Sequence, residues 1–434
     1  MESMKEEKIC VLALGCKVSQ YESGAIKEEL KKMGYNATTD FCTADYYVIN
    51  TCAVTNEAEH KSRSYMTKVL NKNPNAKILI CGCASEHNKE QFLKNPSVIF
   101  VCGNSGKFTI PMFLDNFINN EKSPQKVTIP RDYCSKLTKD YEDFATKTIS
   151  RTRAYLKIQD GCDNFCSYCL IPFVRGRSRS RDINDLVSEA MNLSKDNQEI
   201  VLTGINMSDY RIDGKLALRE VMERLKNVDA RIRISSLEVN IIDEDFMKTL
   251  ASMPNFCPQF HLSMQSGCDR ILSLMNRHYN KSMFLSKIDL IKKYFKDASI
   301  TTDVIVGFPT ETEEDFLETV DTIKKAKFFK MHIFPYSIRN GTKASRMVQV
   351  NGNIKKQRLK ELEKLDAILH DEYLKQMKGK VQYVLTERED DGYVIGYTET
   401  YIKIYLPKPA KNYSLVKIIV GDKYKDGALG TICE

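Results

Sequence analysis

The sequence lacks a hydrophobic run long enough to cross a membrane. Hydrophobic residues make up 42% and charged residues 28% of the 434 residues, and no stretch approaches the ~18 consecutive apolar residues of a membrane span. The charged start MESMKEEK is followed only by the short run ICVLAL, which has neither the apolar core nor the cleavage site of a secretory signal. We therefore expect a cytoplasmic protein with no membrane partner.

The sequence also lacks a strong charge imbalance. It has 65 Lys and Arg against 57 Asp and Glu, and the formal net charge of +8 permits a polyanionic partner without requiring one. Its 14 cysteines would suit a disulfide scaffold in a short secreted chain, but this chain is long and has no signal. Metal binding is the better explanation for this many cysteines.

The length predicts more than one domain, at about 150 residues per domain. Residues 1–118 alternate short β-rich runs with amphipathic helical stretches, which predicts an open parallel α/β domain. Residues 119–150 are polar with little periodicity, and we interpret them as a linker. The β-rich runs of the first domain are residues 9–14, 46–50, 77–81 and 97–102.

Residues 151–378 resume the alternation of strands and helices. Six β-rich runs start about 30 to 45 residues apart, which predicts a partial (β/α)6 barrel, with a helix at 353–378 packed back on it. Residues 379–434 contain short β runs separated by Gly, Asp and Pro turns, which predicts a small antiparallel β-barrel of the oligonucleotide-binding kind. The barrel runs are residues 154–158, 199–203, 231–235, 260–264, 300–306 and 330–334.

Three cysteines follow the first barrel strand in DGCDNFCSYC, at Cys162, Cys166 and Cys169. A cluster of four irons normally takes four thiolates, so three thiolates leave one iron open for a small ligand. The carboxyl ends of barrel strands are where active sites of such barrels lie. The alternatives are a structural zinc site, which would need a fourth Cys or His nearby, and three unrelated buried thiols.

The first domain repeats this pattern less obviously. Cys16, Cys52 and Cys83 each follow a predicted strand, so all three should lie at the carboxyl edge of one parallel sheet, where open α/β folds bind ligands. Spacing alone leaves a second three-cysteine site and unrelated thiols both open. We interpret the remaining cysteines as structural, since free Cys commonly behaves as a small buried hydrophobe.

These residues resemble a known family. C-x3-C-x2-C with Tyr168 before the last cysteine resembles the radical S-adenosylmethionine enzymes, and Cys16, Cys52 and Cys83 narrow the resemblance to the methylthiotransferases. Several segments resemble the subgroup that acts on threonylcarbamoyladenosine next to the tRNA anticodon, although Thr310 stands in GFPTE where the family commonly has glycine. These segments are RTRAYLKIQDGC, IVLTGIN, RIRISSLE, QSGCDRIL, DVIVGFPTETEEDF and HIFPYSIRNGTKA.

The resemblance implies two [4Fe-4S] clusters and S-adenosylmethionine as cofactors. The cluster on Cys162, Cys166 and Cys169 would bind and reductively cleave S-adenosylmethionine, and a second cluster on Cys16, Cys52 and Cys83 would serve sulfur insertion at C2 of the adenine. An electron donor such as flavodoxin or ferredoxin is implied as a partner. The positions expected to contact S-adenosylmethionine are Tyr168, Gly204, Ser235, Ser236, Glu238, Gln265, Val304 and Gly307.

Contact with a tRNA anticodon stem-loop is expected from two basic segments. RGRSRSR places four arginines at alternate positions, which would align on one face of an extended chain and match phosphates. Residues 400–425 contain six Lys against one Asp, interleaved with tyrosines, as expected of a TRAM RNA-binding domain at 379–434. The residues predicted to bind RNA are Arg175, Arg177, Arg179, Arg181, Lys403 and Lys417.

Three other functions remain open at this point. Isopentenyladenosine in tRNA or an aspartate of a ribosomal protein could be the substrate, because enzymes for both share the two cysteine sets. From a different class, the chain could be an RNA-binding protein with non-catalytic iron-sulfur clusters, and such a protein would not cleave S-adenosylmethionine. The sequence does not indicate an oligomeric state.

Overall fold

A computed structural model describes residues 5–122, 132–133, 141, 152–408 and 410–433. The predicted linker at 119–150 lies mostly outside these residues. Within it, a helix of the first domain continues to Lys122, and Asp132–Tyr133 forms an edge strand of the first sheet, so these two pieces belong to that domain. No helix in the described part of the chain is both long enough and apolar enough to cross a membrane.

The N-terminal domain is the open parallel α/β sheet that the sequence predicts. Its strands run in the order β2-β1-β3-β4-β5-β6, and every pairing is parallel. The central strand β3 is buried along its whole length because apolar clusters cover both sheet faces. The strands are β1 (Lys8–Ala13), β2 (Asn36–Thr38), β3 (Tyr46–Thr51), β4 (Lys77–Gly82), β5 (Val98–Cys102) and β6 (Asp132–Tyr133). The helices are α1 (Lys17–Lys32), α2 (Asn56–Lys72), α3 (Cys83–His87), α4 (Glu90–Leu93) and α5 (Ile110–Lys122).

The central domain is a partial barrel of parallel strands, as predicted. Two sheets, β13-β10-β7 and β14-β15-β16-β17, are joined by a bridge between Ile232 and Phe256. The strands are β7 (Ala154–Lys157), β10 (Glu199–Thr203), β13 (Arg231–Ile234), β14 (Ser236–Leu237), β15 (Gln259–Gln265), β16 (Ser299–Val306) and β17 (Lys330–Pro335). The helices are α6 (Ile171–Val174), α7 (Ile183–Ser194), α8 (Leu218–Leu225), α9 (Glu244–Ala251), α10 (Asp269–Leu274), α11 (Lys281–Tyr294), α12 (Glu313–Ala326) and α13 (Gly352–Met377). Two short pairs, β8 (Gln159–Asp160) with β9 (Arg179–Ser180) and β11 (Arg211–Ile212) with β12 (Lys215–Leu216), lie between them.

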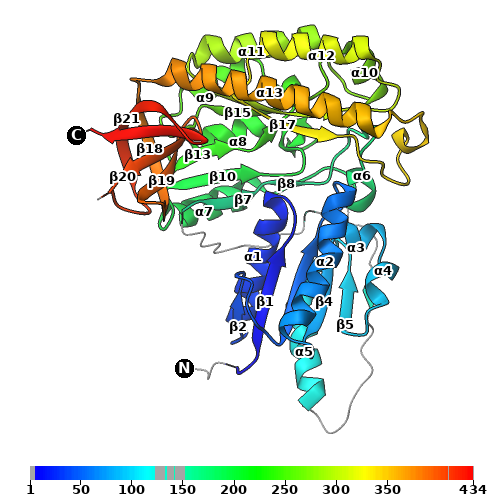
Figure 1. Ribbon diagram of the computed structural model, residues 1–434. Helices are drawn as coiled ribbons and strands as arrows, with labels where there is room; N and C mark the ends of the chain where they lie inside the picture. Colours follow the sequence, from blue (N-terminus) through cyan, green and yellow to red (C-terminus); the bar gives the residue numbers. More distant parts are fainter. Residues whose placement is uncertain (1–4, 123–131, 134–140, 142–151, 409, 434) are drawn as a thin grey trace.

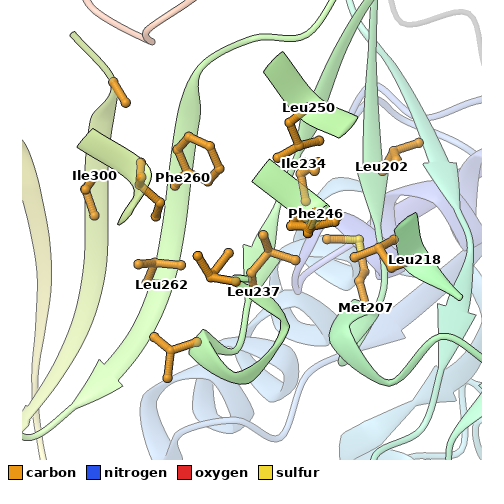
Figure 2. Packing of buried hydrophobic residues seen from close by; sticks show 14 of the residues in the cluster. Leu202, Met207, Leu218, Ile234, Leu237, Phe246, Leu250, Phe260, Leu262 and Ile300 are labelled. Carbon is orange, nitrogen blue, oxygen red and sulfur yellow. The ribbon is translucent and has the colours of Figure 1, made fainter. Parts of the chain in front are cut away.

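The barrel core lies between the strands and the surrounding helices. Alternate residues of each strand point to this core, among them Leu262 and Ile300, and meet helix residues such as Phe246 (Figure 2). The other residues of the same strands, including His261 and Thr301, face the barrel interior. The strand period therefore divides a packed outer layer from an interior cavity lined by both polar and apolar side chains.

The C-terminal module is a closed five-stranded barrel in the order β18-β19-β20-β22-β21. Four pairings are antiparallel as predicted, but the closing pair β20-β22 is parallel, and strand β22 has no counterpart in the sequence prediction. The strands are β18 (Val381–Asp390), β19 (Tyr393–Thr398), β20 (Lys403–Pro407), β21 (Leu415–Tyr424) and β22 (Gly427–Ile432).

The central barrel contacts both other parts (Figure 1). At the amino ends of its strands, Arg233 donates hydrogen bonds to the backbone carbonyls of Thr398 and Glu399 in the C-terminal module, at 3.1 and 2.9 Å. At the other end, α1 contacts β7 and α3 contacts α6, so the N-terminal domain lies against the carboxyl ends of the first barrel strands. That is the end where both cysteine sets are expected.

Candidate active site

The first cysteine set lies in the loop that follows β7 and β8. The thiol sulfur of Cys166 accepts a hydrogen bond from Arg277 at 3.3 Å, and that of Cys162 accepts one from Asn206 at 3.8 Å. Burial first, and then the negative charges of neighbouring thiols, raise the pKa of Cys162 to about 11 and that of Cys169 to about 12. The three thiols are therefore close enough to interact electrostatically.

The second cysteine set lies at the carboxyl edge of the N-terminal sheet, as predicted. Strands β1, β3 and β4 are adjacent and parallel, and Cys16, Cys52 and Cys83 follow them in that order. Burial and then the charges of Cys83 and Cys16 raise the pKa of Cys52 to about 11. Gly82 holds the turn into Cys83 at φ +106°, where a Cβ would lie 2.5 Å from a backbone oxygen of Thr51.

Both sets offer the thiol donors of an iron-sulfur cluster. Within the described ranges, no three His, Cys, Asp or Glu side chains are grouped so as to hold one metal ion. In a four-iron cluster each thiolate binds a different iron, so the ligands stand farther apart than those of one zinc ion. Soft thiolates are also the donor set that iron-sulfur clusters prefer.

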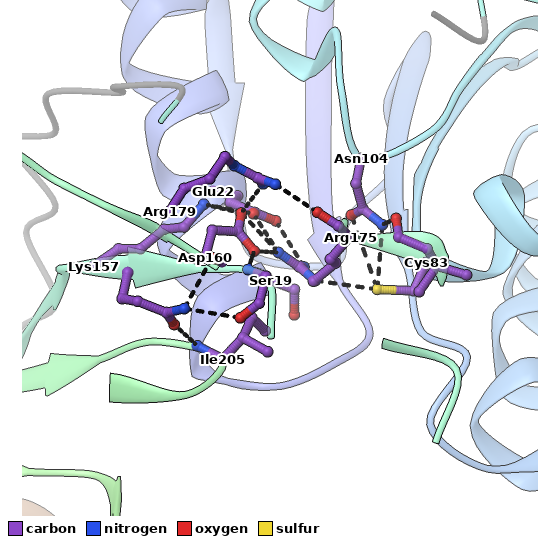
Figure 3. Close-up of polar contacts among 12 residues, drawn as sticks. Ser19, Glu22, Cys83, Asn104, Lys157, Asp160, Arg175, Arg179 and Ile205 are labelled. Atoms are coloured by element: carbon purple, nitrogen blue, oxygen red, sulfur yellow. Dashed lines mark hydrogen bonds and ion pairs between the residues drawn. The ribbon is translucent and has the colours of Figure 1, made fainter. Parts of the chain in front are cut away.

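A buried group of charges joins the two domains beside these cysteines (Figure 3). We call it the interdomain charge cluster; Arg175 pairs with Glu22 and with Asp160, each at 3.0 Å, and Lys157 pairs with Asp160 at 2.6 Å. Lys107 pairs with Glu22 at 2.5 Å. Burial alone would raise the pKa of Glu22, but Arg175, Lys107 and Lys157 hold it well below its ordinary value. The carboxylates of Glu22 and Asp160 are therefore charged and paired with basic side chains.

The interdomain charge cluster reaches the second cysteine set directly. Nε of Arg175 donates to the sulfur of Cys83 at 3.3 Å. Asn104 donates to the same sulfur at 3.5 Å and to the backbone carbonyl of Val174 at 2.7 Å. A segment of the central domain thus supplies hydrogen bonds around a cysteine of the N-terminal domain.

The prediction that four arginines line up on one RNA-binding face is wrong. The side chains of Arg175 and Arg181 are only 2% exposed, and Arg181 pairs with the buried Glu189. Arg179 donates to backbone carbonyls and lies near Asp160. The chain turns at Gly176, which has φ +79°, so the period of two is broken, and of the four only Arg177 stays exposed.

Most lysines of the C-terminal basic segment, residues 400–425, are paired with acidic side chains in the structure. Lys403 pairs with Asp426 at 2.9 Å and its ammonium group lies over the ring of Tyr405, so a phosphate would compete with Asp426; the RNA contact of Lys403 stays a prediction. Three further lysines of residues 400–425 pair with acidic residues that lie outside this range. Lys417 remains exposed, next to the exposed Tyr383 on the neighbouring strand. The three further pairs are Lys408 with Glu389, Lys423 with Asp371 and Lys425 with Asp391.

Two of the cavities along the central barrel contain residues expected to contact S-adenosylmethionine. The larger, about 440 Å³, occupies the barrel interior and includes Ser235 and Ser236. The smaller, about 200 Å³, lies at the carboxyl ends of β15, β16 and β17 and includes Tyr168 and Gln265. Asp303 lines both cavities, so they are neighbours.

Four residues predicted to contact S-adenosylmethionine line neither cavity. Val304 is fully buried in the outer core, because Asp303 and Ile305 take the inward positions of β16; its contact with the cofactor stays a prediction that only its backbone could satisfy. Glu238 pairs with Arg277 beside Cys166. Gly204 packs closely on Gln159 and Met207, and the Gly307 amide donates to Glu311.

Sequence reasoning missed four residues that surround the cysteines or the larger cavity. Asn104, Asn206 and Arg277 donate to thiol sulfurs from positions far along the chain. Lys17 lines the larger cavity, and burial together with the charges of Arg233 and Arg153 lowers its pKa. Only Lys17 carried a sequence signal, since it directly follows Cys16.

Comparison with known proteins agrees with this geometry. Residues 156–323 match the radical SAM superfamily, and residues 8–103 match the uncharacterized protein family UPF0004. The chain is 37% identical over 406 residues to the threonylcarbamoyladenosine tRNA methylthiotransferase MtaB of Bacillus subtilis, covering 90% of this chain and 88% of that protein. The chain belongs to the methylthiotransferase family of radical S-adenosylmethionine enzymes. Like its family, this methylthiotransferase uses S-adenosylmethionine and two [4Fe-4S] clusters as cofactors.

Other relatives lie in the same methylthiotransferase family. MtaB of Thermotoga maritima is 38% identical, covering 90% of this chain and 89% of its own. A tRNA-2-methylthio-N(6)-dimethylallyladenosine synthase from Aquifex aeolicus is 33% identical, with 91% of each chain covered. Among solved structures, the radical S-adenosylmethionine methyltransferase TsrM from Kitasatospora setae has a TM-score of 0.58 at 12% identity and covers 79% of this methylthiotransferase and 74% of its own chain, which shows a shared fold.

Proposed function

We propose that this methylthiotransferase adds a methylthio group to C2 of N6-threonylcarbamoyladenosine next to the anticodon of tRNA. The main support for this proposal is the 37% identity to a threonylcarbamoyladenosine tRNA methylthiotransferase over 90% of the chain. Relatives named for dimethylallyladenosine are less similar, at 33% and 32% identity. A tRNA substrate implies a cytoplasmic enzyme.

Residues of the first cysteine set, Cys162, Cys166 and Cys169, hold one cluster and S-adenosylmethionine in this proposal, and Cys16, Cys52 and Cys83 hold the other. When bound, these groups supply one-electron chemistry and the methylthio group. The thiols of each set lie together, and each set follows the carboxyl ends of parallel strands. Three ligands in each set leave one iron open for a reactant.

The protein's own donors tune these thiolates. Arg277 and Asn206 donate to the first set, and Arg175 and Asn104 donate to Cys83. Hydrogen bonds to thiolate sulfur spread its negative charge, which favours the reduced form of a cluster. The chain thereby supports electron uptake from a donor such as flavodoxin or ferredoxin.

The smaller cavity is the proposed site for the nucleoside part of S-adenosylmethionine. Tyr168 belongs to the first cysteine loop and its ring lies edge-on to Phe308, which packs on Tyr336 of the cavity wall, so the loop and the wall are packed together. Gln265 lies at the rim in a left-handed conformation with φ +63°. Backbone strain of this kind is retained where surrounding structure fixes it, often at binding sites.

The C-terminal module is the proposed handle for the anticodon stem-loop. Tyr383 is 47% exposed and lies opposite the exposed Lys417 in the β18–β21 ladder. An exposed ring beside a lysine can stack an unpaired base and contact a phosphate. Arg177, whose side chain is 70% exposed and pairs with Asp163 at 2.8 Å near the first cysteine loop, is the remaining RNA-contact residue of the arginine segment.

Mass spectrometry of tRNA nucleosides tests the proposal. Cells lacking the gene should accumulate threonylcarbamoyladenosine and lose its methylthio derivative, and the wild-type gene should restore it. A gene encoding Cys52→Ala should not restore it. Loss of methylthio-isopentenyladenosine, or of a methylthio group on ribosomal aspartate, would assign the rival substrates.

The alternative of a non-catalytic RNA-binding protein predicts a different result. The purified enzyme with both clusters should form 5′-deoxyadenosine from S-adenosylmethionine under reducing conditions. Absence of this product in a preparation containing about eight irons per chain would support the non-catalytic alternative.

A further inference from the structure

The larger cavity is built by all three parts of the chain. Lys17 comes from α1 of the N-terminal domain, Tyr401 comes from the C-terminal module, and strands of the central barrel supply the remaining walls. At about 440 Å³ it falls in the size range of sites for small molecules and side groups. Its lining combines the polar side chains of Ser235, Ser236, Gln259 and Thr301 with apolar and aromatic ones such as Val201 and Phe329.

Most cations that line the cavity are already neutralised by acids. Arg153 and Arg233 both pair with the buried Glu199, at 2.7 and 3.0 Å. Lys330 pairs with Asp366. Each of these three cations therefore has an acidic partner that holds it in the wall.

Lys17 differs from these cations. It is partly buried, it faces the cavity, and within the part of the chain that the structure describes it has no hydrogen bond or ion pair. The carboxylate on the cavity wall, Asp303, lies 3.3 Å from Nε2 of His261. An ammonium group removed from water without a partner is unfavourable, and a carboxylate entering the cavity would compensate it.

The position of Lys17 connects the cavity to the chemistry. Lys17 directly follows Cys16, so the ammonium group enters the cavity from the second cysteine set. An adenine whose C2 faces that set can direct the group on N6 into the barrel interior. Threonylcarbamoyl carries one carboxylate and one hydroxyl, whereas a dimethylallyl group carries neither and would leave Lys17 unpaired.

We propose that Lys17 binds the carboxylate of the threonylcarbamoyl group in this cavity and thereby selects the substrate. This inference rests on the proposed function and identifies the part of the substrate that is recognised. The hydroxyl and amide groups of Ser235, Ser236 and Gln259 supply partners for the polar remainder of the same group. The carboxylate of S-adenosylmethionine is the other available source of this chemistry.

Equilibrium binding of RNA to the enzyme with both clusters tests the inference. The probes are anticodon stem-loop RNAs that carry threonylcarbamoyladenosine, its carboxylate methyl ester, or unmodified adenosine. Wild type should bind the free carboxylate about tenfold more tightly than the ester, as expected for a hydrogen bond to a charged group. Lys17→Met should bind both with equal affinity, while its affinity for unmodified RNA stays that of wild type.

Lys32→Met is the matched control. Lys32 lies in the last turn of the same helix, its side chain is 64% exposed, and it pairs with Glu29. This variant should keep the full preference for the carboxylate. Iron content and the visible absorption spectrum of Lys17→Met should equal those of wild type, which separates loss of recognition from loss of a cluster.

Each other outcome has a defined meaning. Equal binding of acid and ester by wild type, or a preference retained in Lys17→Met, overturns the inference. Weaker S-adenosylmethionine binding in Lys17→Met with an unchanged RNA preference assigns Lys17 to the cofactor and also overturns it. If wild type prefers the carboxylate but cells show no methylthio derivative of threonylcarbamoyladenosine, the carboxylate site stands and the proposed function fails.

Discussion

The guanidinium of Arg175 donates through Nε to the sulfur of Cys83 at 3.3 Å, although the two residues lie in different domains. The same side chain bonds Glu22 and Asp160, so one buried arginine connects the helix after Cys16, the loop before Cys162 and the sulfur of Cys83. The distance between the two cysteine sets is therefore fixed by a charged contact in addition to packing.

Replacing Arg175 with Met should destabilise the protein by about 3 kcal/mol, because removal of one partner from a buried ion pair leaves charge uncompensated. Urea unfolding of the protein without clusters measures this loss. The matched control is Arg177→Met, two residues along the chain, whose exposed side chain should contribute less than about 0.5 kcal/mol. Equal losses for the two variants would show that the interdomain charge cluster contributes little to stability.

Glu199 should make stability depend on pH. Burial alone would raise its pKa, but Arg233, Arg231 and Arg153 hold it below the ordinary value of 4.5. A carboxyl group whose pKa is lowered in the folded state stabilises the fold fully at pH values above its pKa in the unfolded state. This stabilisation is lost as the pH falls. The free energy of unfolding should therefore decrease from about pH 5 to pH 3.

Glu199→Gln tests this effect by urea unfolding at several pH values. The variant should be less stable at pH 7 by about 3 kcal/mol and should show a shallower decrease at low pH. The control Glu220→Gln, at an exposed position of α8, should follow wild type. An unchanged slope for Glu199→Gln would assign the acid sensitivity to other carboxyl groups.

Single cysteine replacements should separate the two clusters. Cys166→Ala should abolish 5′-deoxyadenosine formation, whereas Cys52→Ala should retain it and lose sulfur insertion. Each variant should bind about four irons instead of about eight. Cys257→Ala, at a fully buried cysteine outside both sets, should keep the full iron content. Full methylthiolation by Cys52→Ala would disprove the second cluster site.

RNA binding should depend on the exposed pair in the C-terminal module. Lys417→Ala should weaken binding of an anticodon stem-loop equally for different sequences and lower the salt slope by about one. Tyr383→Ala should cost about 1 to 3 kcal/mol, the value of one stacked base. Lys403→Ala serves as the comparison, since Lys403 is already paired with Asp426. A larger effect of Lys403→Ala would place the RNA on another face.

Thr310 should carry backbone strain. It has φ +67°, a conformation that a β-branched residue adopts at a cost, and its amide donates to the carbonyl of Val348 at 3.0 Å. Thr310→Gly should therefore stabilise the protein by about 1 kcal/mol in thermal or urea unfolding. Thr312→Gly, which removes the cap of α12, should destabilise it. Destabilisation by Thr310→Gly would show that the threonine side chain makes a compensating contact.

Much of the fold follows from local pattern. Short apolar runs separated by helical stretches predict parallel strands, and the carboxyl ends of adjacent parallel strands meet at one edge. That geometry is why Cys16, Cys52 and Cys83 could be placed together from sequence. Strand β22 escaped prediction because GALGTI contains two glycines and little β-branched surface.

The burial and the partners of the charged residues could not be predicted in the same way. Whether Arg175 faces RNA or the protein interior depends on Glu22, which is 153 positions away in sequence. The face of the strand on which a residue lies is equally important for its role. Alternation along β16 places Asp303 in the barrel interior and Val304 in the outer core. Motifs locate a strand end, but long-range partners decide which side chain reaches the ligand.

The contacts of Arg231 and Arg233 limit how this enzyme can be recombined with its relatives. Both guanidinium groups donate to backbone carbonyls of the C-terminal module, and the Ser299 hydroxyl donates to the carbonyl of Thr400. Tyr401 of the same turn closes the end of the barrel cavity. A chimera that carries a foreign C-terminal module must therefore reproduce this turn, since a module chosen only for its RNA preference would leave the barrel open at its base.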